Sequence, residues 1–343
     1  MAVNTSSVSS VYAPHIRSAE RLSMRSLDVL LVMVPLCIFS FVNYGWRPVL
    51  LVLTGIVAAI VCEAGACLLM RRRPTLTDGT AAVTGGIIGL LMSPLSPFWL
   101  PVVAAAFAIL VVKMPFGGTG RNVFNPAAAG IAFVTLSFSK ELFTYPDPSP
   151  GTAVSLPLFG SLSHVVTAVS PAAQLQATGT PAYPWYSLLL GDFPGPIGAV
   201  AIAVLLAGLV YLISRRTASG LTTAAFLGTC ALYALLFPRT TLPWGSNLLL
   251  ELCAGYVLFA GIFMLNDPTT SPHYWLGRIV YGFLAGWLLM LMSTVTLGSP
   301  PKFEATACFA VLIVNAFSPA IDRWSWHLVY KIRHIRLRKG GKA

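Results

Sequence analysis

Charged side chains are scarce in this sequence, and acidic side chains are the scarcest. Of 343 residues, 56% are hydrophobic and 10% are charged, with 11 aspartates and glutamates against 22 lysines and arginines. Soluble domains contain roughly 25% charged residues. A water-soluble protein of this length cannot keep so many apolar side chains out of water, whereas a lipid bilayer accommodates them. The composition therefore excludes an ordinary soluble domain and predicts an integral membrane protein.

Sequence patterns of common catalytic and metal sites are also missing. The chain contains no G-x-S-x-G, Walker or H-E-x-x-H pattern, which argues against the hydrolases and kinases that these patterns mark. None of the six cysteines forms a C-x-x-C pair, and the five histidines are scattered over termini and loops. We therefore expect no zinc or iron–sulfur site, and we interpret the cysteines as small apolar packing residues.

Ten apolar segments have about the length of membrane-spanning helices. A hydrocarbon layer about 30 Å thick requires roughly 20 helical residues, although several segments are short or interrupted by glycine and proline. The polar residues 1–27 precede the first segment, and no cleavage site of a secretory signal follows it. We predict an all-α polytopic membrane protein with about ten transmembrane helices, at about 28–44, 48–70, 80–96, 98–114, 124–139, 195–213, 220–237, 246–265, 277–296 and 303–320.

The basic residues predict how these helices are oriented. Eighteen of the 22 lysines and arginines lie on the side of the N-terminus, and the other side holds only Arg47, Lys140, Arg239 and Lys302. By the positive-inside rule, both termini are expected in the cytoplasm and the protein in a bacterial inner membrane. This distribution explains the net charge of +11, so we expect membrane lipid and no nucleic acid as a partner.

The predicted topology divides the chain into five parts. They are a cytoplasmic N-terminal segment (1–27), a five-helix membrane half (28–139), a periplasmic loop (140–194), a second five-helix half (195–322) and a basic cytoplasmic tail (323–343). In each half, an apolar helix runs into a cytoplasmic turn rich in Gly, Pro, Asn, Asp and Thr and then re-enters the membrane. An odd number of spans per half predicts a five-plus-five inverted repeat, which marks either a binding site on its axis or a structural relic.

Two acids fall inside expected spans. Glu63 lies within 48–70, and Glu251 lies near the start of 246–265. A carboxylate in the bilayer is costly unless it is paired, hydrated or protonated, so each is either functional or close to an interface or helix end. We favour the interface for Glu251 and propose Glu63 for an ion path.

Two amides precede a predicted helix in RNVFNPAAAG (121–130). Asn122 and Asn125 lie three residues apart, just before Pro126. Such side chains either cap the helix or hydrogen-bond the polar edge of a flat heterocycle. Asp78 and Asp267 stand in D-G and D-P pairs, for which turn formation is a sufficient reason.

Several strings together resemble the RnfD proteins of the Rnf complex, and the NqrB proteins of the sodium-pumping NADH:quinone reductase are similar. They occur in the same order and spacing from about residue 14 to 325, and include LTDGTAAVTGGIIGLLMSPLSPFWLPV (76–102), VVKMPFGGTGRNVFNPAAAGIAF (111–133), LLLGDFPGPIG (188–198), FMLNDPTTSPHYWLGRIVYG (263–282) and FAVLIVNAFSPAIDRW (309–324). The resemblance implies a ten-span, five-plus-five fold within a multi-subunit respiratory complex. It also implies flavin electron relays: a noncovalent riboflavin near Asn122 and Asn125, and an FMN joined through its phosphate to a threonine on the outer side.

The threonine that would carry FMN is not found at its expected place. Counting back from 188–198, the segment that carries FMN in this family falls on TAVSPAAQL (167–175), where Ala173 stands in place of the threonine and Thr167 in place of an aspartate. Alanine has no hydroxyl group and forms no phosphoester. A shifted alignment with LQATGTP (175–181) offers Thr178 as the acceptor, but it also lacks the aspartate.

The leading hypothesis is a membrane electron-transfer subunit of an Rnf/Nqr-type complex. It would relay electrons through riboflavin, FMN or both and couple this flow to Na⁺ or H⁺ movement, with the other subunits of the complex as partners. Two alternatives are a passive solute transporter or channel, which an inverted repeat also suits, and a scaffold subunit that has lost its flavin.

Overall fold

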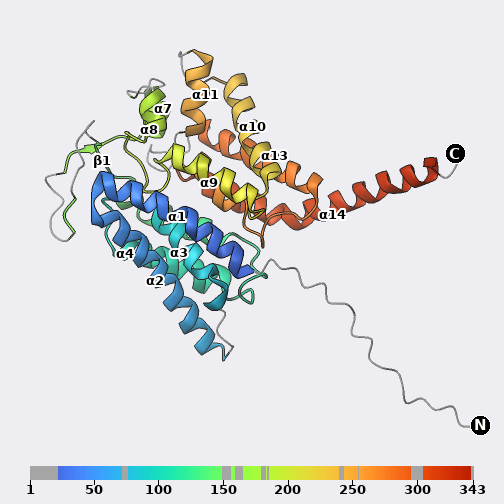
Figure 1. Ribbon diagram of the computed structural model, residues 1–343, viewed down its shortest axis with the longest axis horizontal. Helices are drawn as coiled ribbons and strands as arrows, with labels where there is room; N and C mark the ends of the chain where they lie inside the picture. Colours follow the sequence, from blue (N-terminus) through green and yellow to red (C-terminus); the bar gives the residue numbers. More distant parts are fainter. Residues whose placement is uncertain are drawn as a thin grey trace, which may run out of the picture.

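The structure is a computed structural model that describes residues 22–71, 76–148, 156–158, 165–178, 183, 185–238, 243–253, 255–294 and 304–340. It is an all-α fold with a single two-residue strand pair in this part of the chain (Figure 1). The predicted all-α class is therefore confirmed.

The first half of the chain packs as a group of helices with short connections. Its elements are α1 (Leu22–Tyr44), α2 (Trp46–Leu69), the 3₁₀ turn η1 (Leu76–Asp78), α3 (Thr80–Leu90), α4 (Trp99–Ala106), the π-helical segment η2 (Phe107–Lys113), α5 (Pro126–Ser137) and α6 (Ser139–Leu142). In the following loop, β1 (Tyr145–Pro146) pairs antiparallel with β2 (Thr167–Ala168), and α7 (Pro171–Thr178) and α8 (Trp185–Leu190) follow.

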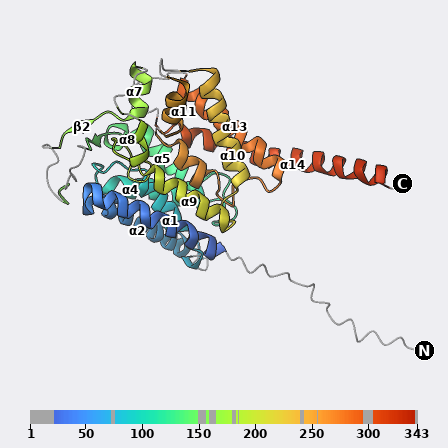
Figure 2. The ribbon, with the colours of Figure 1, turned by 45° about the horizontal axis from the view of Figure 1, so that its top comes forward.

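The second half has its own helices and a second π-helical segment. Its elements are α9 (Ile202–Ser214), α10 (Gly220–Leu236), α11 (Trp244–Cys253), α12 (Val257–Phe259), the π-helical η3 (Ala260–Met264), α13 (Trp275–Thr294) and α14 (Thr306–Gly340). Figures 1 and 2 both place α9 beside α1, so the two halves touch along these helices.

Four helices are long and apolar enough to cross a membrane: α1, α2, α13 and the part Thr306–Lys331 of α14. The pair Trp244–Cys253 and Val257–Met264, bent by 61°, gives a fifth candidate. Each of the ten segments expected from the sequence contains a helix, but several of these helices are shorter than a full crossing. A polytopic chain with four to five candidate spans is supported, while ten crossings and the inverted repeat remain predictions.

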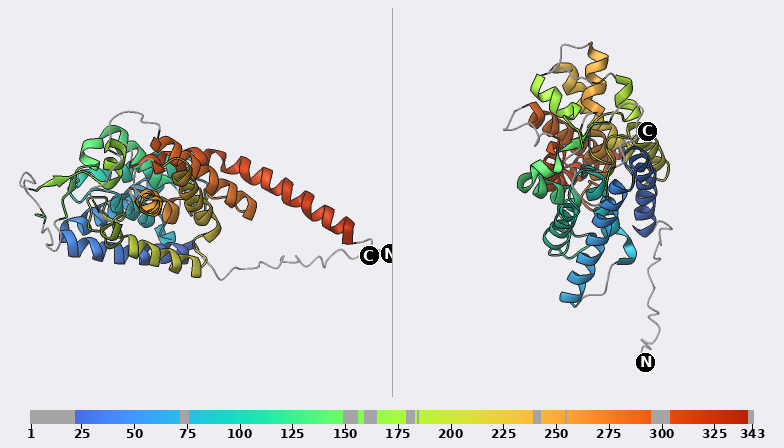
Figure 3. Two further views of the ribbon diagram at one scale, coloured as in Figure 1. Left: turned by 90° about the horizontal axis from the view of Figure 1, so that it is seen from above. Right: turned by 90° about the vertical axis from the view of Figure 1, so that its left-hand side faces the viewer.

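Two helices extend beyond their expected ends. α1 begins at Leu22, inside the segment expected as a polar N-terminal part. α14 continues to Gly340, so the expected basic tail is a continuation of the last helix and projects away from the body (Figure 3). Lysine and arginine are good helix formers, which explains why a charged segment extends the helix after the apolar run ends.

Small residues allow two pairs of helices to pack at close range. In α3, a Cβ added at Gly85 would lie 2.3 Å from the carbonyl oxygen of Gly55 in α2, and Gly89 approaches the same helix. In α13, Gly282 and Gly286 approach the backbone of α10 in the same way. Glycines four residues apart bring membrane helices into backbone contact, which fixes the positions of α3 and α13.

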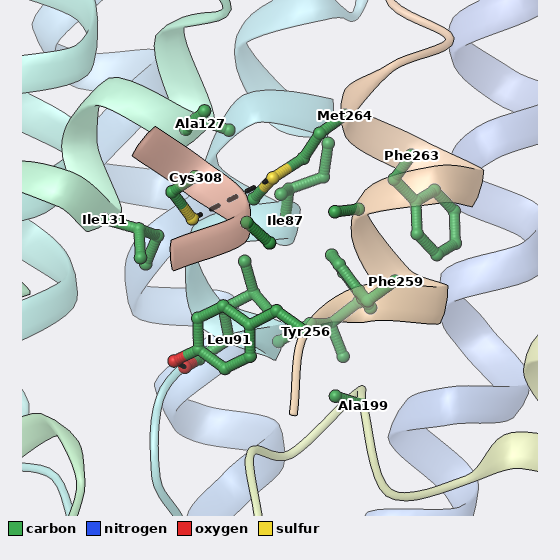
Figure 4. Packing of buried hydrophobic residues seen from close by; sticks show 14 of the residues in the cluster. Ile87, Leu91, Ala127, Ile131, Ala199, Tyr256, Phe259, Phe263, Met264 and Cys308 are labelled. Carbon is green, nitrogen blue, oxygen red and sulfur yellow. Dashed lines mark hydrogen bonds between the residues drawn. The ribbon is translucent and has the colours of Figure 1, made fainter. Parts of the chain in front are cut away.

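The buried core joins the two halves (Figure 4). The hydroxyl of Tyr256 in the second half donates to the carbonyl oxygen of Leu91 in the first at 3.0 Å. Within the second half, the Sγ atom of Cys308 in α14 lies 4.0 Å from the Sδ atom of Met264 in η3. All six cysteines are free thiols within helices, and four are buried. Their expected position in apolar helices is confirmed.

Candidate functional site

A cavity lies where α1, α3 and α5 begin and where η2 and η3 end. Its walls include the amides Asn122, Asn125 and Asn266, and we call it the amide cavity. Its volume is about 100 Å³. Residues from both halves line it, so it forms only in the folded chain.

Asn125 caps helix α5 and also connects the two halves. Its Oδ1 atom accepts a hydrogen bond from the backbone N–H of Ala128 at 3.1 Å, with Pro126 as the first helical residue. Its Nδ2 atom donates to the carbonyl oxygen of Met264 at 2.9 Å. The capping interpretation therefore describes Asn125 correctly, and the side chain has a second role that capping does not explain.

Asn122 does not cap the helix. Its Nδ2 atom donates to Oγ1 of Thr269 at 2.9 Å and to the carbonyl oxygen of Phe124 at 3.3 Å. Thr269 belongs to the turn after η3, so this amide forms a second bond between the halves. The Oδ1 atom of Asn122 accepts no hydrogen bond from the described residues, and the side chain lines the cavity, so this atom is placed to accept one from a ligand.

Glu63 forms a buried ion pair. Its Oε2 atom lies 2.6 Å from Nζ of Lys113, and the two side chains are 1% and 3% exposed. Lys113 is the last residue of η2, lines the amide cavity and also donates to Oγ1 of Thr80 at 2.8 Å. A buried charge whose partner and hydrogen bonds are present is compensated. The structure thus brings Glu63 to the wall of the amide cavity through Lys113.

Sequence reasoning used Lys113 only for the orientation of the helices and missed its pairing. The signal was a lysine inside an expected span, 98–114, in a chain with a glutamate inside another span, 48–70. Buried cations in membrane segments are rare unless they are paired. The sequence does not reveal the partner, because the π-helical turns of η2 determine which face of the helix carries Lys113.

The turn after η3 closes the cavity. Asp267 accepts hydrogen bonds from the backbone N–H of Thr269 at 3.3 Å and from its hydroxyl at 2.9 Å, as expected for a turn residue. Burial raises the pKa of Asp267, while the hydrogen bonds from Thr269 and Thr270 and the charge of Lys113 act to lower it. The Oδ1 atom of Asn266 accepts from the backbone N–H of Ser219 at 2.8 Å, which ties this turn to the start of α10.

The two residues considered for covalent FMN lie in α7 and do not line the amide cavity. Ala173 is buried in the first turn of this helix, where its backbone N–H donates to Oγ of Ser170 at 3.3 Å. Thr178 is the last residue of α7, and its side chain lies outside the described residues. A buried methyl group at position 173 offers no oxygen for a phosphoester.

A buried acid near α7 was missed by the sequence analysis. Glu304 precedes α14 and accepts hydrogen bonds from the hydroxyls of Tyr145, at 2.5 Å, and Ser170. Together with Glu251 it lines a cavity of about 20 Å³. Glu251, which we expected near an interface, is 3% exposed. Glu304 is the second residue of the expected span 303–320. An acid at that position is typical of a helix end, so it gave no sign of burial.

The chemistry of the amide cavity follows from its walls. Val83, Ile87 and Phe263 provide apolar surface, while Asn122 and Lys113 provide an acceptor and a positive charge. A flat heterocycle with a polar edge fits such a combination. The ammonium group of Lys113 favours a ligand that carries or gains negative charge.

Comparison with known proteins places this arrangement in a family. The sequence profile of the NQR2, RnfD, RnfE family matches residues 9–331. The chain is 35% identical to the D subunit of the ion-translocating oxidoreductase complex of Halorhodospira halophila, with 93% of this chain and 94% of that protein aligned.

Two further relatives carry names that specify an ion. The chain is 27% identical to the D subunit of the proton-translocating ferredoxin:NAD(+) oxidoreductase complex of Clostridium ljungdahlii, over 91% of this chain and 93% of that protein. It is 28% identical to the D subunit of the Na(+)-translocating ferredoxin:NAD(+) oxidoreductase complex of Acetobacterium woodii, over 96% of this chain and 97% of that protein. Similarity at this level therefore does not distinguish between the two ions.

Proposed function

Because the chain belongs to the NQR2, RnfD, RnfE family, we propose that it is the RnfD subunit of an ion-translocating ferredoxin:NAD⁺ oxidoreductase and relays electrons through a flavin bound in the amide cavity. It is one component of an ion-translocating oxidoreductase complex, so its partners are the other subunits of that complex. The observation that carries the flavin proposal is that Asn122, Asn125 and Lys113, the partner of Glu63, line one cavity between the halves.

The residues present fit an isoalloxazine ring. The apolar surfaces of Val83, Ile87 and Phe263 suit its flat faces, and Oδ1 of Asn122 and the second N–H of Asn125 suit its edge, which carries both donors and acceptors. A bound flavin would supply one-electron redox chemistry that no side chain of the cavity provides. The protein would contribute orientation through the amides and electrostatic stabilisation through Lys113.

Lys113 gives the cavity a means of communicating with an ion path. The same ammonium group contacts Glu63 and faces the cavity. Negative charge arriving in the cavity competes with Glu63 for this ammonium group, because the attraction of opposite charges is strong where water is excluded. The negative charge of the Glu63 carboxylate would then be less neutralised by Lys113 and would attract a cation more strongly. We assign the ion path to Glu63 on this basis and leave open whether the ion is Na⁺ or H⁺.

The membrane arrangement is part of the same proposal. Arg25, Lys113, Arg216 and Arg278 line cavities at one end of the helix bundle, which we call the basic end. By the positive-inside rule this end faces the cytoplasm of a bacterial inner membrane, as do both termini. We further propose ten spans in a five-plus-five inverted repeat, with the two π-helical segments η2 and η3 at the amide cavity.

For the outer side we propose that no FMN is joined covalently to residue 173. Ala173 is buried and lacks a hydroxyl group. Thr178 remains the alternative acceptor under the shifted alignment. The hydroxyl and N–H groups of loop 140–194 suit a phosphate held without a covalent bond.

Light absorption tests the flavin proposal directly. The full chain, purified with its complex and then separated, should absorb light at about 450 nm, and the colour should leave the protein on acid precipitation. Absence of colour would favour the passive transporter or the flavin-free scaffold. Colour that stays with the precipitated chain would show a covalent link and would direct attention to Thr178.

A further inference from the structure

A second cavity opens beside the amide cavity at the basic end. It has a volume of about 490 Å³, and its walls include Arg25, Arg216, Arg278 and His273. We call it the arginine cavity. It shares Arg25 with the amide cavity but lies between the end of α9, the start of α10 and the turn before α13.

Positive charge in the arginine cavity is not balanced by carboxylates on its walls. The described residues that line it include no aspartate or glutamate. Three acids lie just outside. Asp28 pairs with the neighbouring Arg215 at 3.3 Å, and Asp322 hydrogen-bonds the ring of His273 at 3.0 Å. Asp267, between two lining residues, accepts hydrogen bonds from the hydroxyls of Thr269 and Thr270. Within the described part of the chain, Arg216 and Arg278 form no ion pair. The cavity therefore attracts an anion.

The same cavity carries exposed aliphatic side chains. Ile213 at the end of α9 and Leu221 at the start of α10 both line it and are 41% and 40% exposed. One turn before Ile213 in α9, Val210 is 68% exposed. Trp275, at the start of α13, is 55% exposed. Exposed apolar helix faces suit acyl chains, and tryptophan is enriched at the level of lipid headgroups. An anion that fits this surface has an apolar part beside its charge.

We propose that the arginine cavity binds the phosphate of an anionic phospholipid, with the acyl chains lying along the exposed faces of α9 and α10. Guanidinium groups bind phosphate oxygens in a bidentate way, and basic pockets between membrane helices bind anionic headgroups. An acidic peptide would satisfy the arginines but would make no use of the exposed aliphatic side chains beside them. The inference is independent of the flavin in the amide cavity.

The backbone offers a matched pair of variants for the test. Arg216, which follows the end of α9, has a φ of 57°, and Arg71, which follows the end of α2, has a φ of 52°. This left-handed conformation favours glycine after a helix. Arg216→Gly thus removes a charge from the cavity without straining the backbone. Arg71→Gly makes the same change at the same kind of position, outside the cavity.

The test measures lipid binding to the full chain purified with its complex. Native mass spectrometry would count retained phosphatidylglycerol after exchange into micelles of a zwitterionic detergent, and titration with phosphatidylglycerol would give the affinity. We expect Arg216→Gly and Arg278→Gln each to weaken binding roughly tenfold, as expected for the loss of one charge-assisted contact, and Arg71→Gly to bind as the unaltered chain does.

Two controls distinguish an anionic phospholipid from free inorganic phosphate as the ligand. Phosphatidylcholine of the same chain length should bind much more weakly, and inorganic phosphate should not displace phosphatidylglycerol. Equal losses in Arg216→Gly and Arg71→Gly would overturn the proposal. Full displacement by inorganic phosphate would also overturn it, because the acyl chains would then contribute nothing.

Discussion

Nζ of Lys113 lies 2.6 Å from Oε2 of Glu63, both side chains are buried, and Lys113 lines the amide cavity. The pair joins α2 to the end of η2. Its importance lies in position, since one partner faces the proposed flavin and the other lies within a candidate span. A change to either partner is therefore expected to affect both the stability of the chain and the coupling of electrons to ions.

Lys113→Met should destabilise the chain, because it leaves the buried carboxylate of Glu63 without its cation. Removal of one partner of a buried pair costs about 3–5 kcal/mol. Thermal unfolding followed by fluorescence in detergent would measure the loss as a lower midpoint temperature. The double variant with Glu63→Gln should recover most of the loss. A double variant as unstable as Lys113→Met alone would contradict a direct pairing.

Glu63→Gln should keep electron transfer and reduce ion translocation several-fold. Glutamine preserves the shape and still accepts a hydrogen bond from Lys113, but it lacks the charge that attracts a cation. Electron transfer and ion uptake would be measured together in vesicles that contain the whole complex. Full ion uptake by the variant would remove Glu63 from the ion path.

Asn122→Leu and Asn125→Leu should each lower the amount of noncovalent flavin that the purified chain retains. Each change deletes amide hydrogen bonds, at a cost of about 1–3 kcal/mol if a buried polar edge is left unpaired. Asn125→Asp is the matched control for helix capping, because it keeps the acceptor for Ala128 and removes the donor to Met264. If flavin content is unchanged in both leucine variants, capping and helix contacts are sufficient roles for these residues.

The denatured chain should carry no covalent flavin. Ala173 cannot form a phosphoester, so ultraviolet fluorescence in a denaturing gel should be absent and the mass should match the unmodified sequence. If fluorescence survives denaturation, Thr178→Ala becomes the decisive variant. Loss of the signal in that variant would establish the shifted alignment.

Orientation is tested with reporters fused at two positions. A reporter at residue 165 should be active only if it functions in the periplasm, and one at residue 343 only if it functions in the cytoplasm. The expectation rests on the unequal distribution of the 22 basic residues. The opposite activity at either position would overturn the proposed topology.

The sequence was sufficient for features that repeat along the chain and weak for those that depend on contacts between helices. Apolar runs indicated the helices, and Asn125 before Pro126 indicated the cap of α5. Neither the pairing of Glu63 nor the burial of Glu304 was visible, because their partners, Lys113 and Tyr145, are distant in the sequence. The start of α1 and the end of α14 differ from the expected ones, because both helices extend into segments rich in good helix formers.

The π-helical winding of η2 has a consequence for the Lys113–Glu63 pair. A π-helical turn contains one residue more than an α-helical turn would need, so residues after it are rotated relative to a regular helix. If the same seven residues wound as a regular α-helix, Lys113 would be turned by about 100° around the axis. Its ammonium group would then leave Glu63, although every side chain of the pair would still be present. At this place the winding of the helix is as important as the identity of its residues.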